Sequence, residues 1–523
     1  MKKHWKHIIK GGKDRKDGTS NGSSYRSDKA RTGLKPVSLG ARILFGALFL
    51  AGLSPAVRAS VTLPQVIGHN MVLQRDKPVH IWGSASPMEE ISVRFRGHTV
   101  KTITDAGGHW MLSLPPMHAS SQEADMVISG TNTIVLHHIL TGEVWLCSGQ
   151  SNMEYTMRKN SKVAKTALPE GFSHSPVDEL SYANNDQIRI FLGLRKSMAK
   201  VHPDHEGWSV ARDSALRQFS AAAYFFAKKL YKSLHVPIGM IANAIPGSAI
   251  EPWLAGTITA TDPASDALYF DYSRPGKFYP TLVRPLAPFT IRGFLWYQGE
   301  TNCFMNDSLQ YAYKMQALIH QWRTEWADSA LPFYYVQIAP FYYSKNKGEY
   351  PLDIYTLPKF WEAQALCLQI PHTGMTVSTD LPDNLENIHP PGKWAVGGRL
   401  ADIALAKIYG KPIAYSGPTY LRSVIRQDKM ELYFTGRDGG LISKDAKPLT
   451  YFELAGPDGK YYPAKAVIQS DHIELTCKEV ARPVSARFAW TESAQPNLFN
   501  KAGLPAMPFR TDNPYKNRHI VLK

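Results

Sequence analysis

Between residues 142 and 410, short apolar segments alternate with longer amphipathic ones, and this alternation constrains the fold more than any other feature. The apolar segments have the length and composition of buried strands: Glu143–Leu146, Ile188–Leu192, Ile238–Asn243, Gly293–Tyr297 and Phe333–Ile338. The amphipathic segments have helical periodicity: Ala221–Leu234, Leu309–Trp326 and Trp394–Ile408. Strands that alternate with helices form a mostly parallel sheet covered on both faces. The pattern therefore predicts an α/β domain whose reactive groups lie in loops at the carboxyl ends of the strands.

The segments on either side of this region have the shorter period of β-strands. Runs such as Val79–Trp82 and Ile91–Phe95 are separated by turn-forming clusters, which predicts an N-terminal β-sandwich. After Lys411 the helical pattern fades, and short runs such as Met430–Phe434 return between Gly, Pro and Asp. We therefore expect a leader over 1–59, a β-sandwich over 60–140, an α/β domain over 141–411 and a small β domain over 412–523.

The positive charge of the chain is concentrated at its beginning. The chain has a formal net charge of +16, and residues 1–59 hold 13 of its 60 basic side chains but only three of its 44 acidic ones. The remaining 47 basic and 41 acidic side chains leave +6, so a nucleic-acid-binding surface is disfavoured. The basic stretch, the apolar run Ile43–Leu53 and the small residues Val57 and Ala59 resemble a signal peptide cleaved before Ser60. We expect a secreted or periplasmic protein without stable membrane insertion after cleavage, with an uncleaved anchor as the alternative.

The four cysteines, Cys147, Cys303, Cys367 and Cys477, are far apart and form no CxxC pair. A disulfide framework and a zinc site are therefore disfavoured, although the spacing leaves one or two bridges open.

Polar residues follow three of the predicted strands. Ser151 lies in Leu146–Met153, where a strand-to-helix turn can expose a nucleophilic hydroxyl beside outward-facing N–H groups. Ser148 or Ser151 can equally cap the next helix.

Gly247, after the strand Ile238–Asn243, allows close approach of its backbone N–H to a ligand oxygen. Asn302 ends the polar cluster Trp296–Asn302, and its amide can donate to an oxyanion, although structural networking is an alternative role.

A histidine follows near the end of the predicted α/β domain. His389 has Glu386 three residues before it, a spacing that lets a carboxylate reach the imidazole within one turn and orient it. Asp383 competes for the same role.

These segments follow one another along the chain with a serine, a glycine, an asparagine and a histidine, and this order resembles that of the SGNH hydrolases. Three sequence motifs are more closely similar to those of the sialate O-acetylesterase family: Gly142–Met153, Trp296–Asn302 and Asn387–Lys393. Further similarity to this family covers both predicted β domains: Asn70–Gln74 with Trp82 and Gly83, Ala486–Trp490, Asn497–Asn500 and Leu504–Asp512. The resemblance thus extends from about Val61 to Asp512, and it implies an SGNH-type, flavodoxin-like parallel sheet at the core.

The resemblance also implies a catalytic constellation. Ser151 would be the nucleophile, His389 the general base and then acid, and Glu386 or Asp383 the orienting acid. The backbone N–H groups of Ser151 and Gly247 and the side chain of Asn302 would form the oxyanion hole. Residues expected to line the substrate site are Gln150, Gln298 and Glu300.

The implied reaction is removal of O-acetyl groups from a sugar through an acetyl-serine intermediate, with no metal or organic cofactor. O-acetylated sialic acid is the expected substrate, and acetylated xylan or pectin is the alternative. A rival hypothesis from another class is a non-catalytic carbohydrate-binding protein. The oligomeric state does not follow from the sequence.

Overall fold

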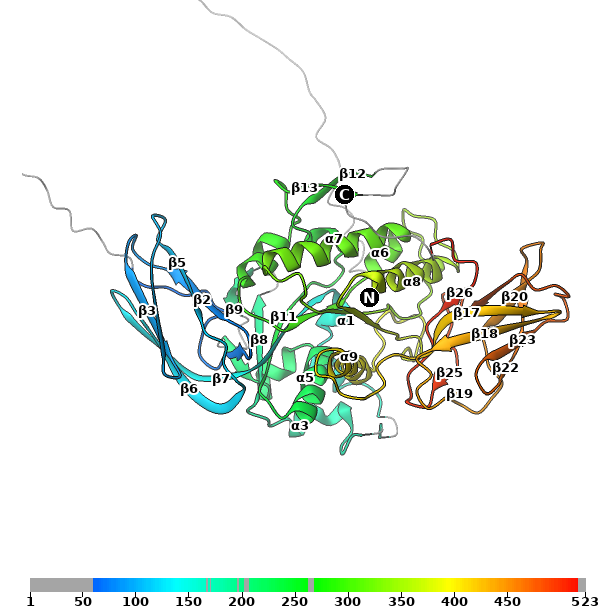
Figure 1. The fold of residues 1–523 in the computed structure, drawn as a ribbon, viewed down its shortest axis with the longest axis horizontal. Helices are drawn as coiled ribbons and strands as arrows, with labels where there is room; N and C mark the ends of the chain where they lie inside the picture. The colour runs from blue at the N-terminus through cyan, green and yellow to red at the C-terminus, as the bar shows by residue number, and fades with distance from the viewer. Residues whose placement is uncertain are drawn as a thin grey trace, which may run out of the picture. The chain divides into compact units, whose positions relative to one another are not determined.

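A central sheet of mostly parallel strands organises the computed structural model, which describes residues 60–515 apart from 166–167, 170, 195–196, 202–206 and 262–267 (Figure 1). The predicted leader lies outside the described residues. The strands of the sheet, in spatial order, are β10 (Trp208–Val210), β8 (Ile188–Leu194), β11 (Ile238–Ala244), β7 (Thr133–Gly149), β14 (Gly293–Tyr297), β15 (Phe333–Val336) and β16 (Thr373–Thr376). All of these neighbours pair in parallel except β10 and β8. The predicted α/β region with a mostly parallel sheet is confirmed.

Five of these strands, β7, β11, β14, β15 and β16, follow one another in the spatial order 2-1-3-4-5, and β8 and β10 extend the edge beyond β11. In this doubly wound order the chain changes direction at β7, between β11 and β14. Ligand sites of such sheets lie outside the carboxyl ends of the strands at this switch point. The carboxyl ends of β7, β11 and β14 are therefore where functional groups should converge.

Helices cover both faces of the sheet, as Figure 1 shows. Helices α5 (Ala221–Leu234) and α9 (Lys393–Lys407) cover one face, and α7 (Leu309–Glu325) and α8 (Thr356–Leu366) cover the other. Successive side chains of β7 point to opposite faces of the sheet and pack under the helices on each side. Val144 and Leu146 belong to one apolar core, and Trp145 and Cys147 belong to the other. Helices α5 and α9 approach closely because Gly397 has no side chain. A Cβ there would collide with the backbone of α5 at Ala222.

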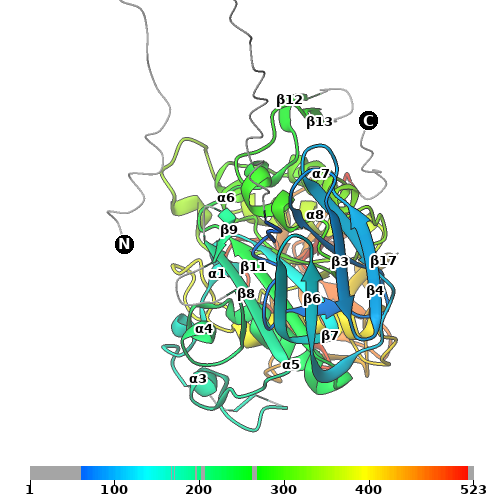
Figure 2. The same cartoon turned by 90° about the vertical axis from the view of Figure 1, so that its left-hand side faces the viewer.

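The strand β7 belongs to two parts of the fold. Its first half pairs antiparallel with β6 (Ser120–Ser129), and its second half pairs with β11 and β14 in the central sheet. The two short runs at 134–138 and 143–146 are thus one continuous strand, and the predicted domain boundary at 140 falls inside it. The other N-terminal strands are β1 (Val72–Gln74), β2 (Val79–Ser84), β3 (Glu90–Phe95), β4 (His98–Ile103) and β5 (His109–Leu114). Figure 2 looks onto β3, β4 and β6.

A buried ionic cluster joins the N-terminal strands to the central sheet. The Glu143 side chain in β7 has no exposed surface and accepts hydrogen bonds from Arg75 Nε (2.5 Å), Arg292 Nε (2.7 Å) and Gln74 Nε2 (3.1 Å). Removing one partner of such a buried pair typically costs about 3–5 kcal/mol, because the remaining charge is left uncompensated.

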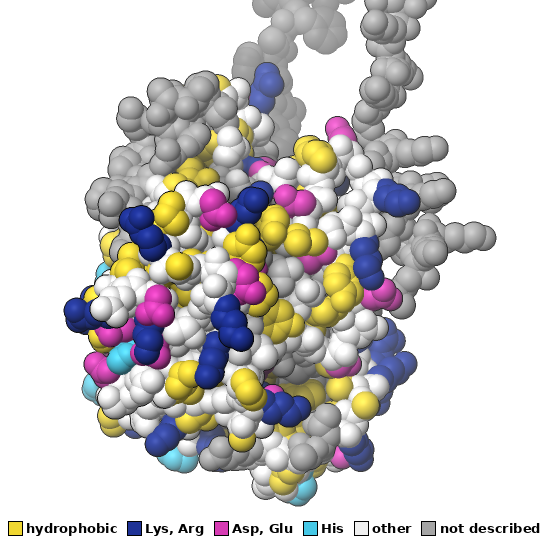
Figure 3. All heavy atoms as spheres, turned by 90° about the vertical axis from the view of Figure 1, so that its right-hand side faces the viewer, with side chains coloured by type: hydrophobic (Ala, Val, Ile, Leu, Met, Phe, Trp, Pro, Cys, Tyr) yellow, Lys and Arg dark blue, Asp and Glu magenta, His cyan; other side chains and the backbone are white. Residues whose placement is uncertain are grey.

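The C-terminal region forms small antiparallel sheets. Its strands are β17 (Thr419–Arg426), β18 (Lys429–Thr435), β19 (Leu441–Ser443), β20 (Phe452–Ala455), β21 (Tyr461–Pro463), β22 (Lys465–Ile468), β23 (Ile473–Thr476), β24 (Ser485–Phe488), β25 (Leu498–Asn500) and β26 (Phe509–Arg510). On the face drawn in Figure 3, basic and acidic side chains are interspersed and hydrophobic ones are scattered among them.

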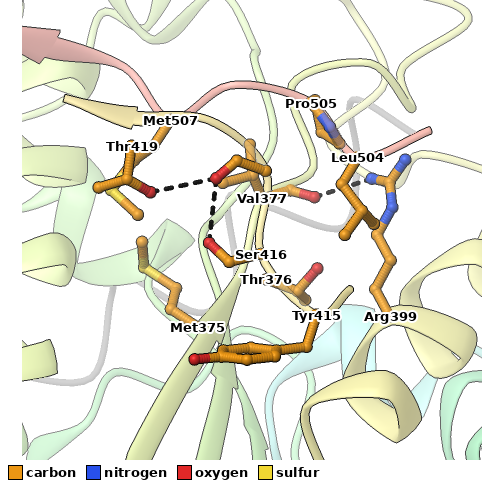
Figure 4. Close-up of a pocket in the computed structure, with 11 residues that line it drawn as sticks. Met375, Thr376, Val377, Arg399, Tyr415, Ser416, Thr419, Leu504, Pro505 and Met507 are labelled. Atoms are coloured by element: carbon orange, nitrogen blue, oxygen red, sulfur yellow. Dashed lines mark hydrogen bonds between the residues drawn. The ribbon is translucent and has the colours of Figure 1, made fainter. Parts of the chain in front are cut away.

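This region packs tightly against the central domain. Figure 4 shows the seam, where Arg399 of α9 donates to the carbonyl oxygen of Val377 (2.8 Å) beside Leu504 and Pro505. The cavity between them measures only about 10 Å³, which is room for about one water molecule.

Two further predictions concern the described residues. All four cysteines are free thiols, so neither of the bridges left open by the spacing is present. Within 60–515, apart from the gaps given above, no helix is long and apolar enough to cross a membrane.

The end of β7 generates the first testable prediction. Gly149 has φ +135°, and a Cβ there would collide with the carbonyl oxygen of Tyr297 in the neighbouring strand. We expect Gly149→Ala to lower the free energy of unfolding by about 2 kcal/mol or more, measured by denaturant or thermal unfolding. Gly68→Ala is the matched control, since the nearest atom to its Cβ would lie 3.7 Å away. Equal stability of the two variants would contradict this account of the turn.

Candidate active site

Ser151 begins the short helix α1 (Ser151–Glu154) directly after the turn that ends β7. Gln150, the N-cap residue of this helix, makes no side-chain capping bond. Ser151 therefore does not serve as the cap, which was the alternative reading of its position. Ser148 is also accounted for, since it is buried and donates to the carbonyl oxygen of Asn243 (3.1 Å). Of the two serines, Ser151 is the partly exposed one.

His389 lies beside Ser151 although the two are 238 residues apart. Its Nε2 is 2.8 Å from Ser151 Oγ, within the reach that a general base needs. Burial, followed by the positive charges of Lys393 and Lys159, lowers the pKa of His389 to about 4. The imidazole is thus neutral at pH 7 and able to accept the hydroxyl proton. The structure brings together the predicted nucleophile and the predicted base.

The imidazole has no carboxylate partner in the described part of the chain. Among the described residues, no Asp or Glu oxygen lies within 4.0 Å of a His389 ring nitrogen. Glu386 instead pairs with Lys345 Nζ (3.0 Å), and its side chain is 68% exposed. Asp383 is exposed as well. The expectation that Glu386 reaches the ring within one turn is corrected, because residues 386–389 form a turn and bends rather than helix.

The predicted oxyanion donors differ in their availability. The backbone N–H groups of Ser151 and Gly247 donate to no described residue, and no atom lies within 4 Å of where a Gly247 Cβ would be. The Asn302 side chain is fully buried, and its Nδ2 donates to Asp307 Oδ2 (2.8 Å) and to both carboxylate oxygens of Glu251 (3.2 and 3.3 Å). Its amide hydrogens are therefore committed to acids, which places Asn302 in a structural network in this conformation.

The three residues expected to line the substrate site are buried and bonded to protein. Gln150 accepts from the N–H groups of Gly299 (3.2 Å) and Thr301 (3.4 Å). Gln298 donates to Asn302 Oδ1 (2.7 Å), and Glu300 accepts from Asn152 Nδ2 (2.5 Å). Since Gln298 has no exposed surface and Gln150 and Glu300 have only 3% and 2%, the structure does not place them on an accessible sugar-binding surface.

Sequence reasoning assigned no role to two polar residues that touch this site. Asn152 follows Ser151, and Lys393 begins helix α9, where it is fully buried and donates to Asn152 Oδ1 (2.7 Å). Both residues lie inside motifs that resemble the family, Gly142–Met153 and Asn387–Lys393, so these motifs could have indicated them. The burial of a lysine, however, cannot be predicted from its position in a motif. Three acidic, histidine or cysteine side chains arranged to hold a metal ion occur nowhere in the described part of the chain.

Similarity to known proteins identifies the family of this chain. A family model described as "Carbohydrate esterase, sialic acid-specific acetylesterase" matches residues 141–406, about half of the chain. The chain belongs to this family. It is therefore a carboxylic ester hydrolase, and the resemblance inferred from the sequence motifs is confirmed.

Individual relatives of this esterase family cover most of the chain. The sialate O-acetylesterase of Homo sapiens is 27% identical over 494 residues, which cover 85% of this chain and 91% of the relative. The enzyme of Mus musculus is 27% identical over 440 residues, covering 71% and 78%. The crystal structure of a carbohydrate acetylesterase from Xanthomonas citri is 33% identical, with a TM-score of 0.74, and covers 87% of this chain and all of that one.

The missing carboxylate contact generates a prediction about Glu386. We expect Glu386→Gln to lower kcat/KM for an aryl acetate by less than about tenfold, whereas loss of a triad acid costs about 10⁴ in kcat. Asp383→Asn, which alters the other acid of this loop, serves for comparison. A loss of about 10³ or more in Glu386→Gln alone would show that Glu386 orients the imidazole during turnover.

Proposed function

We propose that this family member removes O-acetyl groups from sugars by serine catalysis, with O-acetylated sialic acid as the substrate. The observation that carries the proposal is the 2.8 Å separation of Ser151 Oγ and His389 Nε2 at the carboxyl end of β7. The strand order 2-1-3-4-5 with the nucleophile after its first strand further supports an SGNH-type core.

The reaction follows from these two side chains. His389 Nε2 takes the proton of Ser151 as Oγ bonds to the acetyl carbon, and the carbonyl oxygen becomes an oxyanion. The N–H groups of Ser151 and Gly247 are the proposed donors to it, and each such donor is typically worth about 10²–10³ in rate. The tetrahedral intermediate then breaks its bond to the sugar oxygen, which takes the proton from His389.

Water completes the cycle. The oxygen of the water molecule attacks the acetyl-serine ester while His389 accepts a proton from the water, and a second oxyanion forms. Collapse releases acetate and returns the proton to Ser151. No further reactant is required, since one ester and one water give one alcohol and one acetic acid.

The experiment that tests the chemistry compares Ser151, at the start of α1, with Ser148, near the end of β7. We expect Ser151→Ala to lower kcat for an aryl acetate by at least about 10³, while Ser148→Ala, which removes a hydroxyl bonded only to a backbone carbonyl, keeps activity within a few-fold. Mass spectrometry of acid-quenched enzyme should detect an acetyl group on Ser151. Full turnover by Ser151→Ala would refute the proposal, and a folded wild-type protein without turnover would favour a binding role.

The choice of sugar is tested separately. The description of the family and the names of the mammalian relatives support sialic acid, whereas the Xanthomonas citri structure is named only a carbohydrate acetylesterase. We expect kcat/KM for O-acetylated sialic acid to exceed that for acetylated xylan by at least about tenfold. The reverse ratio would assign the enzyme to acetylated polysaccharides while leaving the serine chemistry intact.

A further inference from the structure

Lys393 bonds to the residue that follows His389 and lies in an environment that is unusual for a lysine. It has no exposed surface, and its ammonium group donates to Asn152 Oδ1 and to the carbonyl oxygen of Pro390, both at 2.7 Å. The rings of Tyr155 and Tyr297 lie 4.9 and 5.3 Å from the same nitrogen. Lysines are almost never fully buried without compensating partners, so this position requires an explanation.

Asn152 connects this cation to the buried carboxyl group of Glu300, whose pKa is raised by burial. Its Nδ2 donates to Glu300 Oε1 (2.5 Å) and to the carbonyl oxygen of Ile388 (3.0 Å), while its Oδ1 accepts from Lys393. The amide thus has its negative end toward the ammonium group and its positive end toward the carboxylate. Three segments meet in this network: α1 after β7, α6 (Glu300–Phe304) after β14, and the first turn of α9.

The network holds the backbone on both sides of His389. The carbonyl before the histidine, that of Ile388, is bonded to Asn152, and the carbonyl after it, that of Pro390, is bonded to Lys393. Because Asn152 adjoins Ser151 in the chain, the same side chain ties the histidine loop to the residue next to the nucleophile. The N–H of His389 also donates to Asn387 Oδ1 (3.1 Å), two residues before it, and no carboxylate of the described residues contacts its ring.

We propose that Asn152, Lys393 and Glu300 are positioning residues, which clamp His389 against Ser151 and place a positive charge near an imidazole that no carboxylate of the described residues contacts. This inference rests on the proposed function of Ser151 and His389. It assigns to a lysine and an amide the orienting role that a carboxylate performs in a serine triad.

Burial and the nearby charges together set the pH range in which His389 can act as a base. The charges of Lys393 from α9 and Lys159 from α2 (Met157–Asn160) act on it, and Ser151 Oγ of α1 lies 2.8 Å from its Nε2. Glu300 of α6 is connected to the histidine loop through Asn152. Lys159 itself pairs with Glu154 (3.3 Å), and the exposed Asp383 lies in the loop before the histidine. The pKa of His389 is lowered first by burial, then by Lys393 and then by Lys159. Burial lowers the pKa of Lys393 to about 7, so its charge is present throughout the range in which His389 titrates.

The arrangement involves a compromise. A neighbouring cation opposes the imidazolium that forms during the reaction, so His389 is a weaker base than an acid-paired histidine. In return, the imidazole stays neutral in acidic solution. We expect the acid limb of kcat/KM of the wild-type enzyme to have its midpoint near pH 4 rather than near 6.5, the ordinary value for histidine.

The test separates the charge from the clamp. Lys393→Met removes the cation, so the pKa of His389 should rise, and the acid limb of kcat/KM for an aryl acetate should move up by on the order of one pH unit. Asn152→Ala removes the bonds to Ile388, Glu300 and Lys393 but keeps the lysine and its bond to Pro390, so kcat should fall at least about tenfold with KM nearly constant and a smaller shift of the limb. Lys393→Arg should retain the wild-type limb.

Controls address folding and specificity. Lys407→Met removes a lysine from the other end of α9, where its Nζ donates to the carbonyl oxygen of Thr373 (2.8 Å), and it should change neither kcat nor the pH profile. If Lys393→Met alone does not fold because Glu300 is left uncompensated, the double variant Glu300→Gln/Lys393→Met carries neither charge and should show the same shift. Thermal unfolding at each pH separates loss of base function from unfolding.

The outcomes distinguish the two proposals. An unchanged acid limb in folded Lys393→Met or in the double variant would overturn the inference, as would undiminished kcat in Asn152→Ala. Both results are compatible with inactive Ser151→Ala, in which case the serine chemistry stands without this positioning unit. Turnover by Ser151→Ala would instead overturn the function on which the inference rests.

Discussion

The site depends on one buried polar contact, the amide of Asn152 between the ammonium group of Lys393 and the carboxylate of Glu300. Each of the three groups would be costly to bury alone, and each compensates the others. Asn152 and Glu300 follow two adjacent strands, β7 and β14, and Lys393 begins the later helix α9. The hydrogen bonds among these groups therefore join segments that are up to 241 residues apart. The 2.8 Å separation of Ser151 and His389 is one result of that assembly.

A second buried network supports the other side of the same sheet edge. Asn302 and Gln298 bond to each other, and Lys314 pairs with Glu251 (2.7 Å) and Asp307 (2.6 Å), the two acids that accept from Asn302. The loop that carries Gly247 is tied to this group, since Gln298 donates to the carbonyl oxygen of Ser248 (3.2 Å) and Ile250 donates its N–H to Asn302. Polar residues near an active site can thus hold its loops without touching substrate.

The sequence allowed the sheet, its covering helices and the pairing of Ser151 with His389 to be predicted. Apolar runs with little internal polarity, such as Gly293–Tyr297, coincide with strands because a parallel strand covered on both faces needs apolar side chains on both. The motif wording then identified the serine and the histidine. Roles that depend on hydrogen-bond partners were harder to predict. The acids that engage Asn302 lie at positions 251 and 307, and no local spacing indicates which of several acceptors an amide will choose. The spacing of Glu386 and His389 was informative only if that segment were helical, and it is not.

The uninterrupted course of β7 from Thr133 to Gly149 has a consequence for how this enzyme can be divided. Ser151 directly follows β7, whose first half pairs with β6 of the N-terminal sheet. Residues 72 to 74 of β1 also pair with β7, at residues 140 to 142. A fragment that started at the family match, residue 141, would sever that strand midway and strip Glu143 of its partners Arg75 and Gln74. The N-terminal sheet is therefore inseparable from the hydrolase it precedes, and exchange of such accessory pieces between relatives would have to preserve the whole strand.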